Sequence, residues 1–197
     1  MAWMSPSELS EVGFAHVGVG ARISTRAAIY DPERISIGDF SRVDDFCLLS
    51  GKLTIGRNVH ITAYVNLAGG EEGIEIHDFV GISYASQIFS QSNDYTGRYM
   101  TNPTFPEHYT KAFRSRITIG RHVIIGAGSV VLPGVTIEEG CAIGAHSTVL
   151  SSTQPWGVYV GSPARWLRER HKDVLSLEAQ YLEEMASAQT ELRPEPS

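Results

Sequence analysis

Apolar residues recur at every sixth position through most of this 197-residue chain. Counted from Val19, one register runs to Leu67, resumes at Ile76 after a short slip, and returns from Ile119 to Val149. A second apolar register stands four residues further on and contains Ile23, Ile29, Ile35, Cys47, Leu53, Val59, Val65, Val80, Val123, Val135 and Cys141. A glycine often follows the first register, as in SIGD, TIGR and IIGA.

A period of six is neither the period of a helix nor that of a strand alone. It is typical of short strands that turn an apolar side inward and are joined by tight corners, three to a coil. Successive coils then stack at about 4.8 Å, the spacing of paired strands. We expect the glycines to supply the backbone freedom of the corners. The pattern predicts an all-β solenoid over residues 17–160, because an ordinary sandwich of short strands has no reason to keep this count.

The rhythm breaks at IFSQSNDYTG, residues 88–97, and the interruption predicts an inserted loop at about 92–117. The loop is rich in Tyr, Phe, Asn, Thr and Pro. Aromatic rings beside polar groups make good platforms for sugars and bases. A long loop without periodicity is more typical of a lid or an acceptor site than of a linker.

Both ends of a solenoid need to be covered. We expect residues 1–16 to form an N-terminal cap. Pro163 is well placed to begin a helix, and Leu167, Val174, Leu177 and Tyr181 then form one apolar stripe. The sequence therefore predicts a C-terminal capping α-helix over residues 161–190.

Composition narrows the class of protein. A net charge of −6 and 42% hydrophobic residues favour one domain with a buried core and argue against a nucleic-acid partner. There is neither a signal-peptide pattern nor an apolar run of roughly 18 residues, so we expect a cytoplasmic protein without a membrane span. Cys47 and Cys141 lie four coils apart in the inward register, about 19 Å by the strand spacing. We expect core thiols, because a disulfide needs Cα atoms within about 7 Å.

The hexapeptides, the interrupting loop and the ending GSPARWLRER resemble the hexapeptide-repeat acyltransferases, above all the galactoside, maltose and surface-polysaccharide acetyltransferases. The resemblance covers residues 17–170. It implies a left-handed parallel β-helix and a homotrimer whose sites lie between adjacent prisms. It also implies direct transfer of an acetyl group from acetyl-CoA to a hydroxyl or amino group of a sugar, such as a nucleotide-linked amino-deoxysugar or a surface-glycan precursor.

The resemblance also implies where acetyl-CoA binds. Ala127 in IIGAG and Ala145 in AIGAH stand where family members hold the pantetheine arm with backbone groups. Arg165 and Arg168 in SPARWLR stand where they bind the CoA phosphates, and guanidinium groups pair well with phosphate. We expect Arg170 to be solvated on the capping helix instead.

On the acceptor side, Asn66 stands at the position of a sugar-binding asparagine in galactoside acetyltransferases. An amide suits sugar hydroxyls because it both donates and accepts hydrogen bonds. An asparagine of a solenoid corner is the alternative. Asp44, one coil earlier, is expected to face outward, as an acceptor ligand or as a plain surface acid. Asn93 and Tyr95 at the start of the loop are further candidates.

The loop lacks the histidine that serves relatives as the general base. That histidine aligns with Asn93 in galactoside-type enzymes and with Asp94 in the related antibiotic acetyltransferases, and here the chain reads SNDY. Asp94 is a weak base at an ordinary pKa near 3.9, whereas the ordinary histidine pKa near 6.5 suits proton abstraction by His60 or His108. The missing histidine favours an amine acceptor held by Asp94, with His60 as the principal base.

Two alternatives remain from other classes of protein. A γ-carbonic-anhydrase-like metalloenzyme needs three converging imidazoles, but His60, His77 and His122 occupy different registers, so no metal is expected. We expect His77, His122 and His16 to be simply solvated. A non-catalytic hexapeptide scaffold is the second alternative, and the retained loop and GSPAR ending argue against it.

Overall fold

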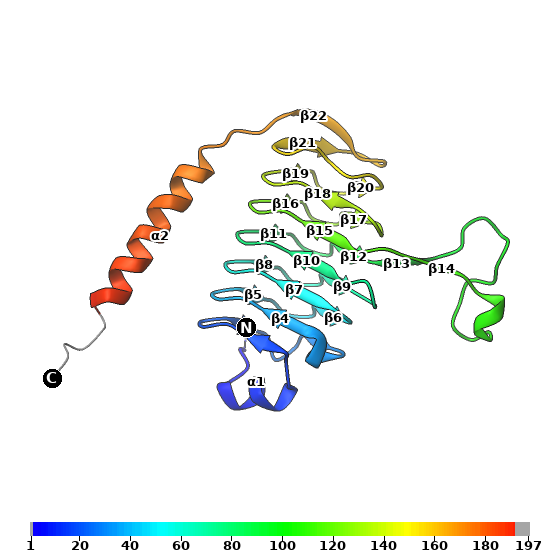
Figure 1. The fold of residues 1–197 in the computed structure, drawn as a ribbon, viewed down its shortest axis with the longest axis horizontal. Coiled ribbons are helices and arrows are strands. Elements are labelled where there is room, and N and C mark those ends of the chain that lie inside the picture. Colours follow the sequence, from blue (N-terminus) through cyan, green and yellow to red (C-terminus); the bar gives the residue numbers. More distant parts are fainter. Residues whose placement is uncertain (1, 192–197) are drawn as a thin grey trace.

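The computed structural model describes residues 2–191, which wind into a stack of short coils with three flat sides (Figure 1). Each side is a sheet whose strands come from successive coils. Sheet 1 consists of β1 (His16–Val17), β4 (Ile35–Ile37), β7 (Leu53–Ile55), β10 (Ile74–Ile76), β15 (Ile117–Ile119) and β18 (Thr136–Ile137). Sheet 2 consists of β2 (Arg22–Ile23), β5 (Arg42–Val43), β8 (His60–Ile61), β11 (Gly81–Ile82), β16 (Ile124–Ile125), β19 (Ala142–Ile143), β21 (Gly157–Val160) and β22 (Arg165–Glu169). Sheet 3 consists of β3 (Ala28–Ile29), β6 (Leu48–Ser50), β9 (Asn66–Ala68), β12 (Gln87–Phe89), β17 (Val130–Val131) and β20 (Thr148–Val149).

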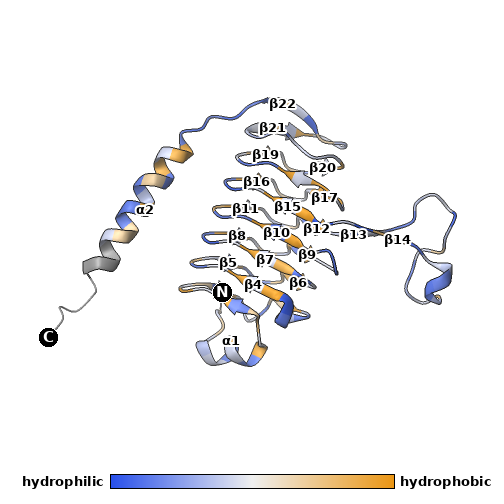
Figure 2. Cartoon of the chain, viewed as in Figure 1, coloured by the Kyte–Doolittle hydropathy of each residue, from blue (hydrophilic) through white to orange (hydrophobic). Residues whose placement is uncertain are grey.

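The predicted solenoid is confirmed, and its strands pair in parallel except for the antiparallel pair β21–β22. Apolar side chains fill the inside of the coils, and Figure 2 shows this as apolar colour along the strands of the stack. Both cysteines are buried and free, as predicted, and burial raises the pKa of the Cys47 thiol to about 11. Within the described residues, no helix is long and apolar enough to cross a membrane.

The count from Val19 is wrong in the first coil. Val19 is 74% exposed, and the inward positions there are Val17, Ile23 and Ile29, which pair with buried residues of the second coil. The 3-10 turn η1 (Pro32–Arg34) shifts the register before the regular count begins. A turn that adds residues without adding a strand is invisible to a count of apolar positions.

The repeat glycines have a different role from the one predicted. Gly38 and Gly56 do not have positive φ. A Cβ atom added to Gly38 would lie 2.6 Å from the carbonyl carbon of Gly56, and one on Gly56 would lie 2.8 Å from the Asp78 nitrogen. These glycines let successive coils approach each other. The corners are instead made largely by residues with side chains at positive φ.

Two of these corners matter below. The first corner, between sheets 1 and 2, contains Phe40, Asn58, Phe79, His122, Gly140 and Trp156. The second corner, between sheets 2 and 3, contains Phe46, Tyr64, Ala85, Gly128 and His146. Backbone hydrogen bonds link successive members of each corner from coil to coil.

The C-terminal segment differs from its prediction. Residues after Pro163 form strand β22, which pairs with the exposed edge of β21, and helix α2 (Val174–Glu191) begins only after it. Pairing satisfies backbone groups that the last coil would otherwise leave open. The β21–β22 hairpin therefore covers the end of the stack, and α2 runs along its side (Figure 1). Leu167 lies on β22 and is not part of a helical stripe.

Helix α2 packs against the first corner. Glu178 accepts hydrogen bonds from Arg121 and His122, and the Asn58 amide donates to the Tyr181 hydroxyl at 3.0 Å. The His122 side chain is only 3% exposed, so the prediction of a solvated histidine is wrong. Arg170 is not solvated either. Its guanidinium donates to the carbonyl oxygens of His122, Gly140 and Cys141 at 2.7, 2.9 and 3.2 Å.

At the other end, helix α1 (Pro6–Val12) lies against the first coil (Figure 1). A capping box between Ser5 and Glu8 fixes its N-terminus. Met4, Leu9 and Phe14 are half-buried against the core. This segment therefore covers apolar side chains that the first coil would expose.

Candidate functional site

The outward side of sheet 2 brings residues from distant parts of the chain into one row. Cross-strand pairing aligns Arg42, His60, Gly81, Ile124, Ala142, Val158 and Arg168 in that order. A neighbouring outward row contains Asp44, Thr62, Ser83, Gly126, Gly144, Val160 and Arg165. We call these two rows the sheet 2 strip. From His60 to Arg168 it spans five strand steps, about 24 Å.

A bulge places both predicted phosphate-binding arginines on the strip. Arg165 pairs with Val160 and Arg168 pairs with Val158, with a register shift between them. Because two residues separate the arginines, they would face opposite sides of a regular strand. Each guanidinium donates to a nearby carbonyl, Arg165 to Ala164 at 3.2 Å and Arg168 to Glu169 at 3.3 Å. Neither arginine has a carboxylate partner among the described residues, so both can pair with phosphate.

At the opposite end of the strip, His60 is held by a carboxylate. His60 Nε2 lies 3.0 Å from Asp44 Oδ2, and Arg42 Nε donates to Asp44 Oδ1 at 2.6 Å. The bond assigns the proton to Nε2, which leaves Nδ1 as an acceptor. The His60 side chain is 45% exposed. The dyad therefore orients an accessible imidazole as a base.

The predicted exposure of Asp44 is wrong. Its side chain is 4% exposed, because Arg42 and His60 enclose both oxygens. An acid in this setting positions the imidazole rather than contacting an acceptor. The alternation of inward and outward positions predicts the side of the sheet on which a residue lies. It does not predict which neighbouring side chains cover a short residue such as Asp44.

Between these ends the strip and the second corner carry small residues. The amide groups of Ala127 and Ala145 have no hydrogen-bond partner among the described residues, and Ala145 is exposed. The Ala127 carbonyl is already taken by the amide of His146 at 2.8 Å. Free amides beside small side chains fit the predicted contact with the amide-containing pantetheine arm of acyl-CoA.

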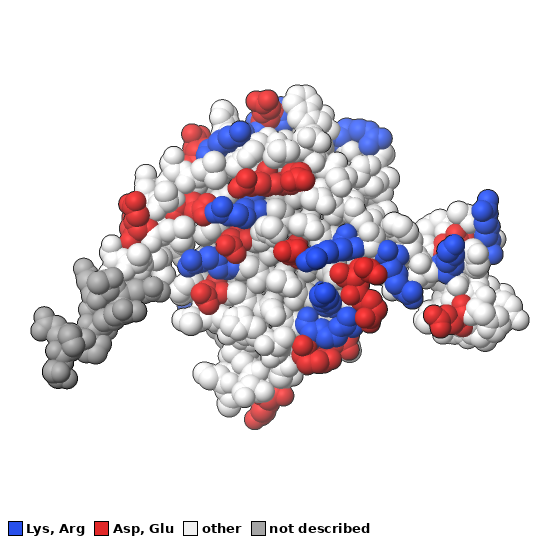
Figure 3. All heavy atoms as spheres, in the orientation of Figure 1, with Lys and Arg blue, Asp and Glu red and all other residues white. Residues whose placement is uncertain are grey.

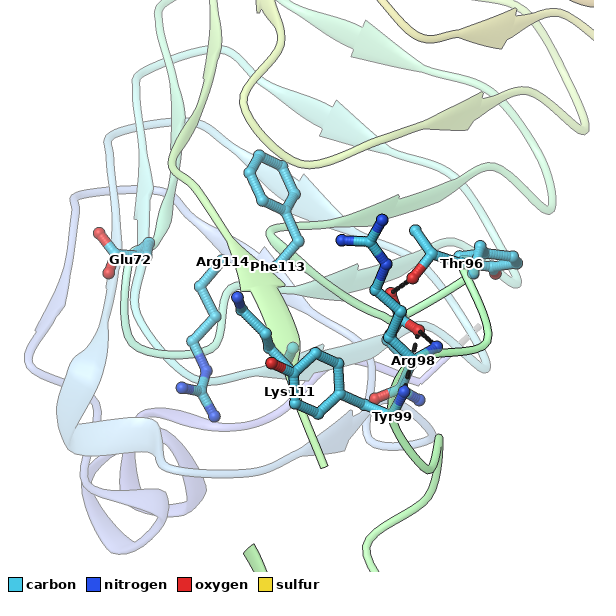
Figure 4. Close-up of a pocket in the computed structure, with 11 residues that line it drawn as sticks. Glu72, Thr96, Arg98, Tyr99, Lys111, Phe113 and Arg114 are labelled. Atoms are coloured by element: carbon cyan, nitrogen blue, oxygen red, sulfur yellow. Dashed lines mark hydrogen bonds between the residues drawn. The ribbon is translucent and has the colours of Figure 1, made fainter. Parts of the chain in front are cut away.

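The inserted segment is an arm rather than a loose loop. Strands β13 (Gln91–Asn93) and β14 (Ala112–Arg114) pair antiparallel, and the 3-10 turn η2 (Glu107–Tyr109) lies beyond them. The arm leaves the stack after β12 of sheet 3 and projects away from it (Figure 1). A hollow of about 720 Å³ at the arm is lined by Glu72, Asn93, Asp94, Tyr95, Thr96, Arg98, Tyr99, Lys111, Ala112, Phe113 and Arg114 (Figure 4).

Asp94 lies at the wall of this hollow with a largely fixed carboxylate. The Thr96 hydroxyl donates to Oδ1 at 2.8 Å, and the amides of Arg98 and Tyr99 donate to Oδ2 at 3.1 and 3.3 Å (Figure 4). The bond from Thr96, followed by those from the backbone, lowers the pKa of Asp94 below its ordinary value. Asp94 is therefore a poor base but a persistent anion, with lone-pair capacity left for one further donor.

Within one chain, the structure does not bring the arm to the strip. Asn93, Asp94 and Tyr95 line the hollow, whereas His60 is on β8 of sheet 2 and does not. Tyr95 is 92% exposed. His108, the other candidate base, lies in η2 with its ring against Tyr109, 4.1 Å between centroids.

Asn66 faces outward from sheet 3, next to Gln87 of the following coil. Its amide nitrogen donates to Gln87 Oε1 at 3.1 Å, and its own Oδ1 is buried without a partner among the described residues. An unsatisfied buried acceptor is costly, so this oxygen is suited to a donor from outside the chain.

Sequence reasoning missed the cations of the hollow, Arg98, Lys111 and Arg114, because loop charges carry no periodic signal. No group of three or more His, Cys, Asp or Glu side chains is arranged to hold a metal within the described residues.

Comparisons with known proteins agree with this arrangement. The family described as Bacterial transferase hexapeptide (six repeats) matches residues 116–151. The dTDP-4-amino-4,6-dideoxy-D-glucose acyltransferase of Escherichia coli is 41% identical over 182 residues, covering 91% of this chain and 94% of the relative.

Solved structures give the same result. The structure of AntD, an N-acyltransferase from Bacillus cereus, in complex with dTDP and 3-hydroxybutyryl-CoA is 43% identical, with a TM-score of 0.92 over 94% of this chain and 100% of that chain. A maltose O-acetyltransferase from Clostridium difficile 630 is 22% identical, with a TM-score of 0.51 over 84% of this chain and 74% of that chain, and shows the fold alone. The predicted left-handed parallel β-helix is thereby confirmed.

Proposed function

This chain belongs to the hexapeptide-repeat sugar acyltransferases, and on that premise we propose that it transfers the acyl group of acetyl-CoA or a related acyl-CoA to the amino group of a dTDP-linked amino-deoxysugar. The acceptor class is supported by the Escherichia coli relative, an acyltransferase of dTDP-4-amino-4,6-dideoxy-D-glucose, and by the complex of AntD with dTDP. The observation that carries the proposal is the sheet 2 strip, which has two unpaired arginines at one end and an oriented imidazole at the other. The arm adds an anion where an alcohol-acylating relative has a histidine.

The residues divide the chemistry between them. Acyl-CoA supplies a thioester carbonyl, with its phosphates on Arg165 and Arg168 and its pantetheine amides at Ala127 and Ala145. The sugar amine attacks that carbonyl, so a C–N bond forms and the C–S bond breaks. One proton passes from nitrogen to His60 Nδ1 and then to the departing sulfur, which balances the reaction. Asp94 holds the amine by a hydrogen bond in the attacking orientation.

The site requires a second copy of the chain, because the arm leaves from sheet 3 and the strip lies on sheet 2. We propose a homotrimer in which the arm of one copy reaches the strip of the next. Closed cyclic symmetry then makes three equivalent sites. Asn93 and Tyr95 would accompany Asp94 to the acceptor, and Asn66 would contact it from sheet 3.

The side chains of the three sheets support packing through sheet 3. Its outward row consists of Ala28, Leu48, Asn66, Gln87, Val130 and Thr148, none of which is charged. Sheet 1 carries the ion pair Arg116–Glu75, and charged side chains of both signs spread over the face seen in Figure 3. An uncharged face is the one best suited to burial between copies.

Turnover of acetyl-CoA and 3-hydroxybutyryl-CoA with dTDP-4-amino-4,6-dideoxyglucose tests the activity directly, with hydroxy-sugars as alternative acceptors. For Asp94→Asn we expect kcat/KM to fall by about 100-fold, and for His60→Ala a smaller loss with an amine than with a hydroxyl acceptor. Glu107→Gln, on the same arm but outside the lining of the hollow, is the matched control and should keep full activity. Wild-type activity in both Asp94→Asn and His60→Ala would refute these roles.

The lowered pKa of Asp94 gives a pH test of the same assignment. A carboxyl group with a lowered pKa is ionised at every pH above that pKa. It loses its negative charge only as the pH falls through the lowered pKa. Between pH 5 and 9, the dependence of kcat/KM on pH should therefore have the same shape in wild type and in Asp94→Asn, with no rising or falling part that is present only in wild type. A limb in this range that disappears in Asp94→Asn would show that Asp94 itself titrates as the base.

Complementation tests the shared site. One variant carries Asp94→Asn, and the other carries His60→Ala with Arg165→Ala and Arg168→Ala. If arm and strip come from different copies, an equal mixture of co-expressed chains regains about a quarter of wild-type activity, since each partner is intact in half of the copies. No regained activity, or a monomer by light scattering, would refute the shared site.

A further inference from the structure

The second corner carries an exposed stack of two aromatic rings beside the sheet 2 strip. Phe46 and Tyr64 occupy successive coils, with ring centroids 5.1 Å apart and an interplanar angle of 19°. Phe46 is 48% exposed and Tyr64 is 59% exposed. Arg26 lies over the Phe46 ring, 5.7 Å from its centroid, so one end of the stack is covered.

Both rings stand at positions that an aromatic residue adopts at a cost. The φ angles of Phe46 and Tyr64 are 60° and 65°, in the left-handed region where a bulky residue is an outlier. Glycine serves the same position at Gly128 in this corner. About half of each residue stays exposed, so the strain is only partly offset by burial. Residues held in such strained conformations concentrate at functional sites.

The first corner shows that this exposure is not a general property of the fold. Phe79 also has positive φ, at 60°, but its ring stacks on His122 at 5.2 Å and meets Tyr181 of α2 edge-on at 6.2 Å. Arg121 lies over it as well, at 5.9 Å. An aromatic residue of the first corner therefore has a packing role that the rings of the second corner lack.

The open side of the stack faces small residues. The two coils beyond Tyr64 place Ala85 and then Gly128 at the same corner, and the imidazole of His146 leans back over Gly128. Each step is about 4.8 Å, whereas a stacked planar ring needs about 3.5 Å. A flat ring from outside the chain therefore fits on Tyr64 at the level of Ala85.

We propose that the open face of Tyr64 stacks the nucleobase of the nucleotide-linked acceptor, with Phe46 supporting it from behind. The inference rests on the proposed function and assigns its base-binding subsite. The stack lies next to Asp44 and Thr62, at the end of the strip opposite Arg165 and Arg168, so the base and the CoA phosphates do not compete. Stacking recognises the π-face of a base and not its hydrogen-bond pattern. We therefore expect acceptors with other nucleobases to bind, whereas an acceptor without a base binds weakly.

Calorimetry of dTDP binding to the full-length protein tests this subsite. Base stacking on an aromatic side chain contributes enough that Tyr64→Ala should weaken dTDP binding about 5- to 100-fold, while Tyr64→Phe stays within about threefold of wild type. Ala85→Phe places a ring of the chain itself at the same level and should also abolish tight binding. Phe79→Ala in the first corner is the matched control, and it should leave the Kd for dTDP unchanged.

Two further measurements, turnover of alternative acceptors and light scattering, separate the possible outcomes. Wild type should acylate the dTDP- and UDP-linked amino sugars comparably and the amino sugar 1-phosphate at least tenfold less well. If wild type acylates the dTDP sugar but Tyr64→Ala and Ala85→Phe bind dTDP normally, the base lies elsewhere and only the subsite is refuted. If wild type neither binds dTDP nor acylates its sugar, the proposed function fails together with the subsite. Dissociation of the oligomer in Tyr64→Ala, seen by light scattering, would show that the stack packs against a second copy instead.

Discussion

The two corners that flank sheet 2 are built from similar residues and are used differently. In the first corner Phe79 and His122 are covered by helix α2, and Arg170 binds three carbonyl oxygens there. In the second corner Phe46 and Tyr64 stack on each other, Arg26 lies over Phe46, and both rings stay exposed. The type of residue at a repeat position therefore does not fix its role. What packs against it decides between stability and binding.

Loss of Arg170 should give the largest effect on stability, because this side chain holds the C-terminal segment to the first corner. Arg170→Ala leaves the carbonyl oxygens of His122 and Gly140 without their donor, whereas that of Cys141 keeps the Ile124 amide, and we expect a loss of about 3 kcal/mol in the free energy of unfolding. Urea denaturation measures it. Arg168→Ala, two residues earlier and exposed, is the control. If Arg170→Ala lowers the free energy of unfolding no more than the control does, the structural role assigned to the first corner is wrong.

Phe79→Ala should come next, with a loss of about 2 kcal/mol in the free energy of unfolding. Its half-buried ring stacks on His122, and truncation of an aromatic ring in a packed setting costs more than its area alone. Thermal unfolding at constant protein concentration measures the effect. Full stability in this variant would mean that both corners tolerate the loss of a ring, and the contrast between them would fail.

The strip should respond to mutation in substrate binding rather than in stability. Arg165→Ala and Arg168→Ala should each raise the KM for acyl-CoA about tenfold and leave the KM for the acceptor unchanged, because phosphate contacts far from the thioester act as uniform binding. Steady-state kinetics measure both constants. Arg22→Ala, at the far end of sheet 2, is the matched control. Normal acyl-CoA binding in both variants would show that the phosphates lie elsewhere.

Tyr64→Gly should give the smallest change in stability, within about 0.5 kcal/mol of wild type. Glycine relieves a left-handed conformation that costs an L-residue about 1–2 kcal/mol, and this relief offsets the lost contact with Phe46. Thermal unfolding of Tyr64→Gly beside Phe79→Gly is the direct comparison of the two corners. A large loss in the Tyr64 variant would mean that the second corner is structural too.

The solenoid could be predicted from the sequence, because the six-residue count of residues such as Ile37, Val43 and Leu49 allows only one inward side for each strand. It also determined the interruption after Ile88 and the absence of a loop histidine at Asn93 and Asp94. These are local patterns, and each depends on residues close together in the chain. The slip at the first coil escaped the count because a short turn adds residues without changing the apolar pattern.

Which side chains meet depends on contacts between segments that are far apart in the sequence. The bulge in β22 that turns Arg165 and Arg168 to one side depends on pairing with β21, and the burial of Asp44 depends on Arg42 and His60 from two coils. The C-terminal segment became a strand because the last coil offered an open edge, although Pro163 could equally have begun a helix. Contacts between coils set the environment of each side chain, and no pattern within a single coil contains that information.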